Sequence, residues 1–530
     1  MKHSARRWRR IGAMLGLCLL QAACSTSQVS VITAPDDPQT RDLVSQTIEL
    51  VATRYIDPIS RDQILVNTLD GLSELDENIR VGITPDSLVL QYDGRTIQTI
   101  ALPPTSYEQS GPENGQLWSD ITLQGLGTYR AYSPVLRASK TLDVQAALVS
   151  GAIRNLDRYS RYEGPAQAET ARNRRDGYIG IGVRLIGGDG YPVVKLVHPD
   201  SPAAKAGLHP GDQVISVNGA NMYGKNSTHT AELLHGEEGS SVRIEVNAAD
   251  SDVIIPMEIM RERVIDRTVF AEIRDNILIA KLTSFNSATA STLSDNILKA
   301  QLYKGGLRGV ILDLRGNRGG LLQQGVAVAD LFLPNGSIGN TFSRVTAARH
   351  VFRAETGDMT DGAPLIILID GRTASSAELV AAALQDRNRA VLVGSTSFGK
   401  GSVQAINDLP NHGTLTFTWS RMTAPSGYTF DRIGLFPAIC TQSNDDDSAA
   451  HKVSNALSKR EQTASTMAKW RNLDYLDEKS RRELRDVCPA HSNSDAFDVE
   501  VALELLKNSP DYKNLAFVGQ QEIADTFDAH

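Results

Sequence analysis

The sequence predicts an α/β protein with several domains, and three observations support this fold class. The chain has 530 residues, which is too long for one ordinary hydrophobic core. From about residue 275, apolar runs of strand length alternate with helical patterns, as expected where helices cover a sheet. The preceding stretch, 177–263, instead contains short strand patterns separated by turn signals, which predicts a compact β-rich unit.

Composition is that of an ordinary soluble globular protein, with 41% hydrophobic and 22% charged residues. The formal net charge of −8 argues against nucleic acid as the main partner. No internal run reaches about 18 uninterrupted apolar residues, so no internal transmembrane helix is expected.

The N-terminus has the pattern of an export signal. A basic start, MKHSARRWRR, precedes the apolar stretch IGAMLGLCLLQAAC, so residues 1–23 are interpreted as a signal peptide. LQAAC (20–24) resembles a bacterial lipobox, which would make Cys24 a lipidation site and residues 24–40 a lipidated tether. Gln21 stands where an aliphatic residue is usual in that pattern. An ordinary signal peptide with an incidental cysteine is the alternative.

The cysteines favour one disulfide. Of the four, Cys18 leaves with the signal peptide and Cys24 would carry lipid, so Cys440 and Cys488 remain. In an oxidising compartment two leftover cysteines can pair. Two free, buried thiols are the alternative.

The region 41–176 is expected to be helical with a β-rich insertion. Apolar residues have helical spacing from Asp42 to about Ile79 and again over 142–162. Residues 81–135 contain alternating stretches such as SLVLQYDG and turn signals such as PENG, which indicate short strands and loops.

Within 177–263, GYIGIGVRL and YPVVKLV are expected strands separated by the turn signal GGDG (187–190). Residues 201–219, SPAAKAGLHPGDQVISVNG, predict a short helix, a Pro-Gly-Asp turn, a strand and an Asn-Gly turn. A helix over 228–236 follows, and SSVRIEV and VIIPMEIM close the unit as strands.

The α/β region is assigned to 264–440. Its expected strands are ILIAKL, LRGVILDLRG, PLIILID and AVLVG, and its expected helices are TASTLSDNILKAQLYKGG, LLQQGVAVADLFL and SSAELVAAALQD. The C-terminal region, 441–530, turns polar and has helical patterns around 465–486 and 497–506.

Two adjacent serines, Ser375 and Ser376, follow the PLIILID strand where a helix should begin, at about Ser375. A serine there is most often an N-cap. The same position suits a nucleophile, because the first N–H groups of a helix are free and can stabilise an oxyanion.

A nucleophilic serine needs a base, and Lys400 is the candidate. None of the ten histidines lies in a motif typical of a serine triad, and the chain has no G-x-S-x-G elbow. Lys400 lies in STSFGKGSVQ, where Gly399 and Gly401 allow close backbone approach. Burial can keep such a lysine neutral. A solvated turn lysine is the alternative.

These residues carry a family resemblance. The stretch 371–404, GRTASSAELVAAALQDRNRAVLVGSTSFGKGSVQ, resembles the active-site region of the C-terminal processing peptidases, also called tail-specific proteases. The resemblance implies a crotonase/ClpP-like serine-protease core in which Ser375 is the nucleophile, Lys400 is the base and Gln404 orients the lysine amine.

The resemblance covers roughly 140–437, and two further segments extend it, DLRGNRGGLL (313–322) and SRMTAPSGYTFDRIGLFP (420–437). DLRGNRGGLL resembles the family's D-L-R-x-N-P-G-G-L-L, so Gly319 or Gly320 is expected to complete an oxyanion hole with the backbone N–H of Ser376. Only that N–H of Ser376 is expected to be used. Ser376-Ala377 replaces the usual Ala-Ser, Arg318 replaces a proline, and Ser397 replaces a threonine. Ser376 leaves the nucleophile ambiguous by one residue, and none of the departures removes the Ser375, Lys400 or Gln404 side chains.

The unit 177–263 resembles the PDZ domain of the same family. GIGV (Gly180, Ile181, Gly182 and Val183) corresponds to the loop whose backbone N–H groups capture a peptide C-terminus. A glycine turn at the start of a strand is the alternative.

The resulting hypothesis is a Ser/Lys endopeptidase exported to the bacterial envelope, periplasmic and lipid-anchored to a membrane. It would bind protein substrates by their C-termini, with no metal or organic cofactor and with an adaptor or homo-oligomer as an open possibility. A catalytically silent PDZ scaffold is the alternative. A non-peptidase of the crotonase-like fold would need a nucleotide or acyl-thioester pocket, for which the sequence gives no support.

Overall fold

A computed structural model describes residues 38–103, 113–187, 190–249, 251, 253–355, 357–442, 448–473, 477–492 and 496–518. The expected signal peptide, Cys24 and most of the tether lie outside these residues. Within the described part of the chain, no helix has both the length and the apolarity needed to cross a membrane.

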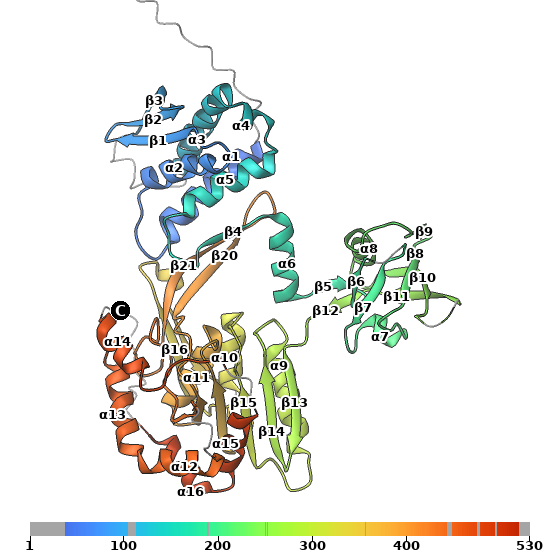
Figure 1. The fold of residues 1–530 in the computed structure, drawn as a ribbon, viewed down its shortest axis with the longest axis vertical. Helices are drawn as coiled ribbons and strands as arrows, with labels where there is room; N and C mark the ends of the chain where they lie inside the picture. The colour runs from blue at the N-terminus through green and yellow to red at the C-terminus, as the bar shows by residue number, and fades with distance from the viewer. Residues whose placement is uncertain are drawn as a thin grey trace, which may run out of the picture.

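The core is a six-stranded sheet in the order β13-β14-β15-β18-β19-β22 (Figure 1). β13 pairs antiparallel with β14, and the other neighbours are parallel. β15, β18 and β19 are buried at every position, which explains their continuous apolar sequences. The strands are β13 (Val269–Arg274), β14 (Ile277–Leu282), β15 (Gly309–Asp313), β18 (Leu365–Ile369), β19 (Ala390–Gly394) and β22 (Ile439–Cys440).

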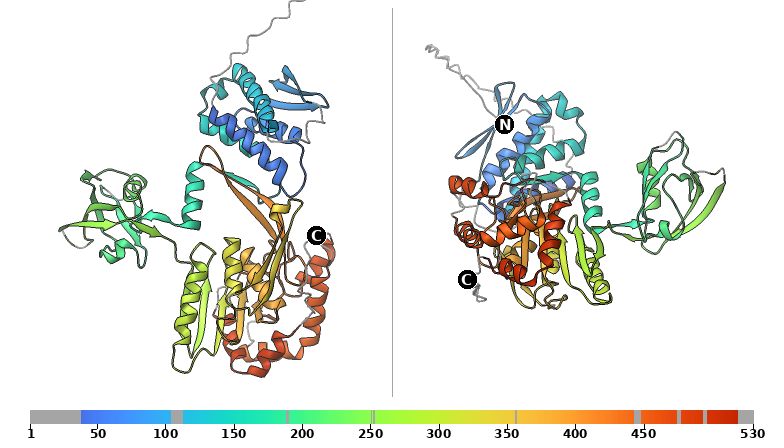
Figure 2. Two further views of the ribbon diagram at one scale, coloured as in Figure 1. Left: turned by 180° about the vertical axis from the view of Figure 1, so that it is seen from behind. Right: turned by 60° about the horizontal axis from the view of Figure 1, so that its bottom comes forward.

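Helices cover both faces of this sheet. The connecting helices α9 (Thr289–Gln301), α10 (Leu322–Asp330) and α11 (Ser376–Asp386) share one face, as right-handed crossovers require. The other face is covered from the C-terminal region, where α15 (Phe497–Leu506) packs on β15, β18 and β19, and α16 (Ser509–Ala516) packs on β19 (Figure 2). The C-terminal region is therefore a layer of the core.

The C-terminal region also contains α12 (Ala449–Ser458), α13 (Arg460–Arg471) and α14 (Glu478–Arg485). A disulfide joins Cys440, at the end of β22, to the buried Cys488 that follows α14. This link ties the region to the edge of the core sheet.

A second, antiparallel sheet has the order β17-β16-β21-β20, with β4 added to β21. The β20–β21 hairpin rises from the core toward the N-terminal helices (Figure 1), where its apolar side chains join their core. The strands are β4 (Arg161–Glu163), β16 (Gly336–Phe342), β17 (His350–Ala354), β20 (Ser402–Asp408) and β21 (Thr414–Thr423).

The N-terminal region is a helical bundle that carries a three-stranded antiparallel sheet. Its helices are α1 (Pro38–Arg54), α2 (Arg61–Asp70), α3 (Glu113–Tyr132), α4 (Pro134–Ala138) and α5 (Thr141–Ile153), and its strands are β1 (Ile79–Thr84), β2 (Ser87–Tyr92) and β3 (Arg95–Ala101).

The prediction of strands and loops throughout 81–135 is wrong after β3, because α3 occupies 20 residues of that stretch. Its glycines obscured the helical pattern, and Gly125 among them serves packing between helices. A Cβ at Gly125 would lie 2.9 Å from a methyl carbon of Leu69 on α2. The close approach of these helices therefore requires the residue type that weakens the helix signal.

The β-rich unit stands beside the core and is joined to it by α6 (Pro165–Asp176) and the antiparallel pair β5–β12 (Figure 1). Its sheet has the order β11-β10-β8-β7-β6, with β9 beside β8. The elements are β5 (Tyr178–Gly180), β6 (Val183–Ile186), β7 (Val193–Val197), α7 (Pro202–Lys205), β8 (Gln213–Val217), β9 (Ala220–Asn221), α8 (Ser227–Leu234), β10 (Ser241–Asn247), β11 (Ile254–Met260) and β12 (Glu262–Val264).

The sequence GYIGIGVRL was expected to form one strand, but it forms two, β5 and β6. The chain breaks at Ile181 and Gly182, where Gly182 has a φ of 86° and its carbonyl accepts the N–H of His198 at 2.9 Å. A Cβ at Gly182 would lie 2.3 Å from Ser201 Cβ, so this position requires glycine.

Candidate active site

Ser375 occupies a strained turn between β18 and α11. It caps α11 with a φ of 59° and a ψ of −120°, which non-glycine residues rarely adopt. Such backbone conformations are unfavourable by about 1–3 kcal/mol and persist where the surroundings impose them. The Ser375 side chain is partly exposed at the start of the helix, where N–H groups are free.

Glu378 holds the Ser375 turn and the Lys400 loop together. Its fully buried carboxylate accepts the N–H of Ser375 at 2.9 Å and the N–H of Lys400 at 2.8 Å on the same oxygen, Oε2. Oε1 accepts the N–H of Gly399 at 2.7 Å and the hydroxyl of Ser397. Burial raises the pKa of Glu378, and these hydrogen bonds oppose that shift. One carboxylate therefore fixes the relative position of both loops.

Lys400 lies in an environment that favours its neutral form. Burial, followed by the positive charge of Arg161, lowers the pKa of Lys400 to about 8. The Nζ atom lies 4.8 Å from the ring centroid of Tyr159, so an aromatic ring lies beside the buried amine. A neutral lysine amine can accept a proton from a serine hydroxyl.

The two adjacent serines have different surroundings. Ser376 is 1% exposed, and its hydroxyl donates to the carbonyl of Gly320 at 3.0 Å. This side chain therefore docks the glycine loop onto α11, and the expectation that catalysis uses only the backbone N–H of Ser376 stays a prediction. Both serines line the cavity described below, but Ser375 is the more exposed of the two.

The glycine loop lies directly against these serines. A Cβ on Gly319 would lie 2.8 Å from Ser375 Cβ and 3.1 Å from the Ser376 nitrogen. The N–H of Gly319 already donates to Asn317 Oδ1 at 2.8 Å. The N–H of Gly320 donates to no acceptor within the described residues, and the carbonyl of Gly320 accepts the Ser376 hydroxyl. Of the two glycines, Gly320 therefore has the backbone N–H that is more available to a ligand.

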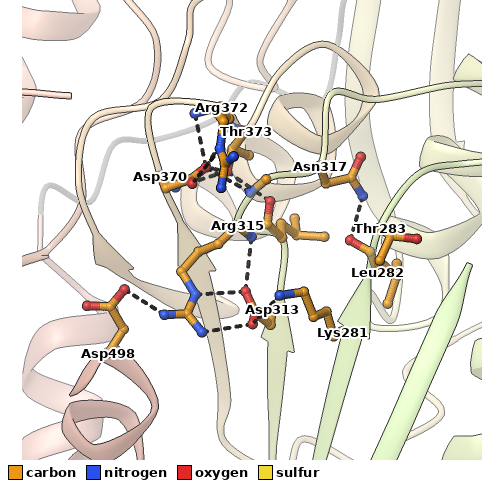
Figure 3. Close-up of polar contacts among 12 residues, drawn as sticks. Lys281, Leu282, Thr283, Asp313, Arg315, Asn317, Asp370, Arg372, Thr373 and Asp498 are labelled. Atoms are coloured by element: carbon orange, nitrogen blue, oxygen red, sulfur yellow. Dashed lines mark hydrogen bonds and ion pairs between the residues drawn. The ribbon is translucent and has the colours of Figure 1, made fainter. Parts of the chain in front are cut away.

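A buried ionic cluster supports the strand that leads into this loop (Figure 3). Arg315 makes a bidentate pair with Asp313, with both distances 2.9 Å, and its third nitrogen lies 2.9 Å from Asp498 of α15. All three side chains are at most 6% exposed. The C-terminal layer thus contributes a charged group beneath the glycine loop.

Asp370 links the same loop to the Ser375 turn. Its Oδ1 atom accepts the N–H groups of Gly316, Arg372 and Thr373 at 2.9–3.0 Å (Figure 3). The N–H of Ala374 donates to the carbonyl of Asn317 at 2.9 Å. The Ser375 turn and the glycine loop therefore form one hydrogen-bonded unit.

A cavity of about 680 Å³ opens over these groups. Its lining includes Ser375, Lys400, Gln404, Gly319 and Gly320. Gln404 donates to Ser402 Oγ at 3.0 Å and to Thr418 Oγ1 at 3.3 Å, and its role in orienting Lys400 stays a prediction. No residue of 177–263 lines the cavity, so Gly180–Val183 form a separate region.

Comparison with known proteins identifies the family. Residues 276–440 match peptidase family S41 and residues 193–247 match a PDZ domain. The carboxy-terminal-processing protease of Bartonella bacilliformis is 34% identical over 299 residues, which span 56% of this chain and 68% of that protein. The carboxy-terminal processing protease CtpA of Bacillus subtilis is also 34% identical over 299 residues, 55% of this chain and 63% of that protein. The chain belongs to the carboxy-terminal processing protease family.

This carboxy-terminal processing protease is a serine-type peptidase with a PDZ domain. The predicted fold class, an α/β protease core with an inserted PDZ domain and helical N- and C-terminal regions, is confirmed. A solved structure of a photosystem II D1 C-terminal processing protease has 24% identity, covers 71% of this chain and 92% of its own, and gives a TM-score of 0.35.

Two residues of the processing-protease site were not assigned from the sequence. Glu378 stands three residues after Ser375, the spacing of a capping box, and that spacing could have indicated a bond to the Ser375 N–H. Tyr159 lies more than 200 residues before Lys400, and no local pattern connects it to the lysine.

Proposed function

We propose that this peptidase hydrolyses peptide bonds with Ser375 as nucleophile and Lys400 as general base. One observation carries the proposal: the N–H groups of Ser375 and Lys400 bind the same carboxylate oxygen of Glu378, and both residues line one cavity. Ser376 is the weaker candidate for the nucleophile because its buried hydroxyl is engaged by Gly320.

In the proposed reaction, Ser375 Oγ attacks the scissile carbonyl carbon while the neutral Lys400 amine takes the hydroxyl proton. The N–H groups of Ser376 and Gly320 hold the resulting oxyanion, with Gly319 as the alternative donor. Lys400 then returns the proton to the departing amine as the C–N bond breaks. Water, deprotonated by Lys400, hydrolyses the acyl-enzyme and regenerates Ser375.

The PDZ domain would recognise the substrate in this proposal. PDZ domains add a peptide as an extra β-strand and capture its terminal carboxylate on successive backbone N–H groups. Gly180–Val183 span the break between β5 and β6, where such a loop would lie. Because this loop is outside the cavity, the substrate would be held at its C-terminus and cleaved at another point along its chain.

The pH dependence tests the lysine mechanism. Lys400 acts only when neutral, and its pKa is lowered to about 8. We expect kcat/KM to rise with pH through a limb near 8, well below the ordinary lysine value of about 10.4. Steady-state kinetics on a denatured protein substrate measure the limb. A single limb near pH 6.5 would indicate a histidine base and contradict the assignment.

We also propose that the protease is exported and anchored through a lipid on Cys24. The basic start, the apolar stretch and LQAAC support this location. We expect Cys24→Ala to move the mature protein from the membrane fraction to the soluble fraction, measured by fractionation and immunoblotting. Intact mass of the wild type provides the check, because a mature protein without added lipid mass would show that Gln21 prevents lipidation.

A further inference from the structure

The cavity over Ser375 has a basic lining, although the whole chain carries a net charge of −8. Among the residues that line it, Glu163 is the single carboxylate. The arginines that line it are Arg161, Arg172, Arg174, Arg175 and Arg318. The charge of the cavity lining is therefore positive, whereas the net charge of the whole protein is negative.

Helix α6 supplies three of these arginines, and its position across the cavity is fixed at both sides. Arg172 donates to Thr414 Oγ1 and to the carbonyl of His412 in the β20–β21 hairpin, both at 3.3 Å. The carbonyl of Arg175 accepts the N–H of Ser287, before α9, at 3.0 Å. Figure 1 shows α6 between the hairpin and the arm to the PDZ domain.

Three of the five guanidinium groups have carboxylate partners. Arg161 pairs with Glu163 at 3.5 Å, Arg172 with Asp408 at 3.1 Å and Arg175 with Asp176 at 2.8 Å. Arg174 and Arg318 are exposed and have no ion pair within the described residues. These two arginines leave the cavity with uncompensated positive charge.

Arg318 lies one residue before Gly319, which packs directly against Ser375. Its guanidinium is thus carried by the loop proposed to hold the oxyanion, beside the peptide bond to be cut. Arg174 approaches from a different element, α6. A bound polypeptide would therefore pass between two charged groups, one on the Gly319 loop and one on α6.

We propose that this cleft selects polypeptide segments with Asp or Glu side chains beside the scissile bond, and that Arg318 and Arg174 determine this specificity. The inference rests on the proposed peptidase function and adds a substrate class to it. Arginine binds carboxylates through two parallel hydrogen bonds. A cleft lined by one sign of charge also concentrates substrates of the opposite sign.

The experiment uses internally quenched peptides of one length and one C-terminus in which the flanking positions are Glu, Gln or Lys. We expect the wild type to give the highest kcat/KM on the Glu peptide and the lowest on the Lys peptide. The double variant Arg174→Gln/Arg318→Gln should lower kcat/KM on the Glu peptide by roughly two- to thirtyfold, as expected for two exposed ion pairs. The ratio of kcat/KM on the Glu peptide to kcat/KM on the Gln peptide should fall with it, which separates lost charge recognition from a general loss of activity.

Three controls sharpen the result. Arg308→Gln removes an exposed arginine at the opposite end of β15, outside the cavity, and should leave the order of the peptides unchanged. Arg318→Lys keeps the charge and should retain most of the preference. High salt should reduce the wild-type preference, because exposed charges are screened.

Equal kcat/KM for the Glu and Gln peptides in the wild type would overturn the proposal. So would a preference that disappears when the peptides carry a C-terminal amide, because the arginines would then bind the terminal carboxylate. Cleavage of the Gln peptide that is lost in Ser375→Ala supports the proposed function whatever the charge preference. A wild type that cleaves neither the peptides nor denatured casein overturns that function and the charge proposal with it.

Discussion

Ser375→Ala should reduce kcat by about 10⁴-fold or more while the protein stays folded, because the variant loses the attacking oxygen and keeps the backbone contacts. Lys400→Met should have an effect of similar size, since methionine fills the space beside Tyr159 and cannot accept a proton. The two residues act on one step, so the double variant should be little worse than either single variant. Cleavage of denatured casein, with circular dichroism as the folding check, measures all three.

Ser376→Ala is the matched control. It removes a hydroxyl that docks Gly320 onto α11, and we expect a loss of no more than about tenfold in kcat, the effect of one hydrogen bond. An active Ser375→Ala with an inactive Ser376→Ala would show that the nucleophile is the neighbouring serine. A folded wild type with no activity on any substrate would favour the silent PDZ scaffold.

The sequence indicated the core because its strands are buried on both faces. Runs such as LIILI and AVLVG cannot be solvent-exposed, and the helices between them have clear periodicity. The β20–β21 hairpin gave no comparable signal. Its two ends pack in different domains, so its apolar pattern reflects tertiary contacts that local sequence does not encode.

The residues of the candidate site also differ in how far local sequence indicates them. Ser375 and Lys400 stand in local patterns that a reader of the sequence can recognise. The elements that hold them depend on long-range contacts: Glu378 bridges two loops, Tyr159 arrives from another region, and Asp498 reaches Arg315 from α15. Those contacts become visible only when the chain is folded.

The C-terminal region is hydrogen-bonded directly to the loops that carry Ser375 and Lys400. The carbonyl of Cys488 accepts the hydroxyl of Thr396, and the carbonyl of His491 accepts the N–H of Gly371 at 2.7 Å. Arg485 donates to the carbonyl of Ser397 at 3.2 Å. These bonds reach the loops of both Ser375 and Lys400, so displacement of this region should disturb catalysis as well as stability.

The double variant Cys440→Ala/Cys488→Ala should therefore be less stable and less active. The cysteines are 48 residues apart, and the chain-entropy estimate for such a loop is about 4 kcal/mol, with measured effects commonly lower. We expect the free energy of unfolding to fall by roughly 2–4 kcal/mol, with kcat reduced more than KM. Urea titrations followed by circular dichroism and by activity measure the two effects.

Reductant supplies the matched comparison. Dithiothreitol in mild urea should lower the unfolding midpoint of the wild type and leave the double variant unchanged, because the variant has no bond to break. Non-reducing peptide mapping of the native protein should recover Cys440 and Cys488 in one linked pair. Two freely alkylated thiols, with equal stability of variant and wild type, would contradict the bond. The α15 contacts with β15, β18 and β19 and the Asp498–Arg315 pair would then hold this layer without a covalent link.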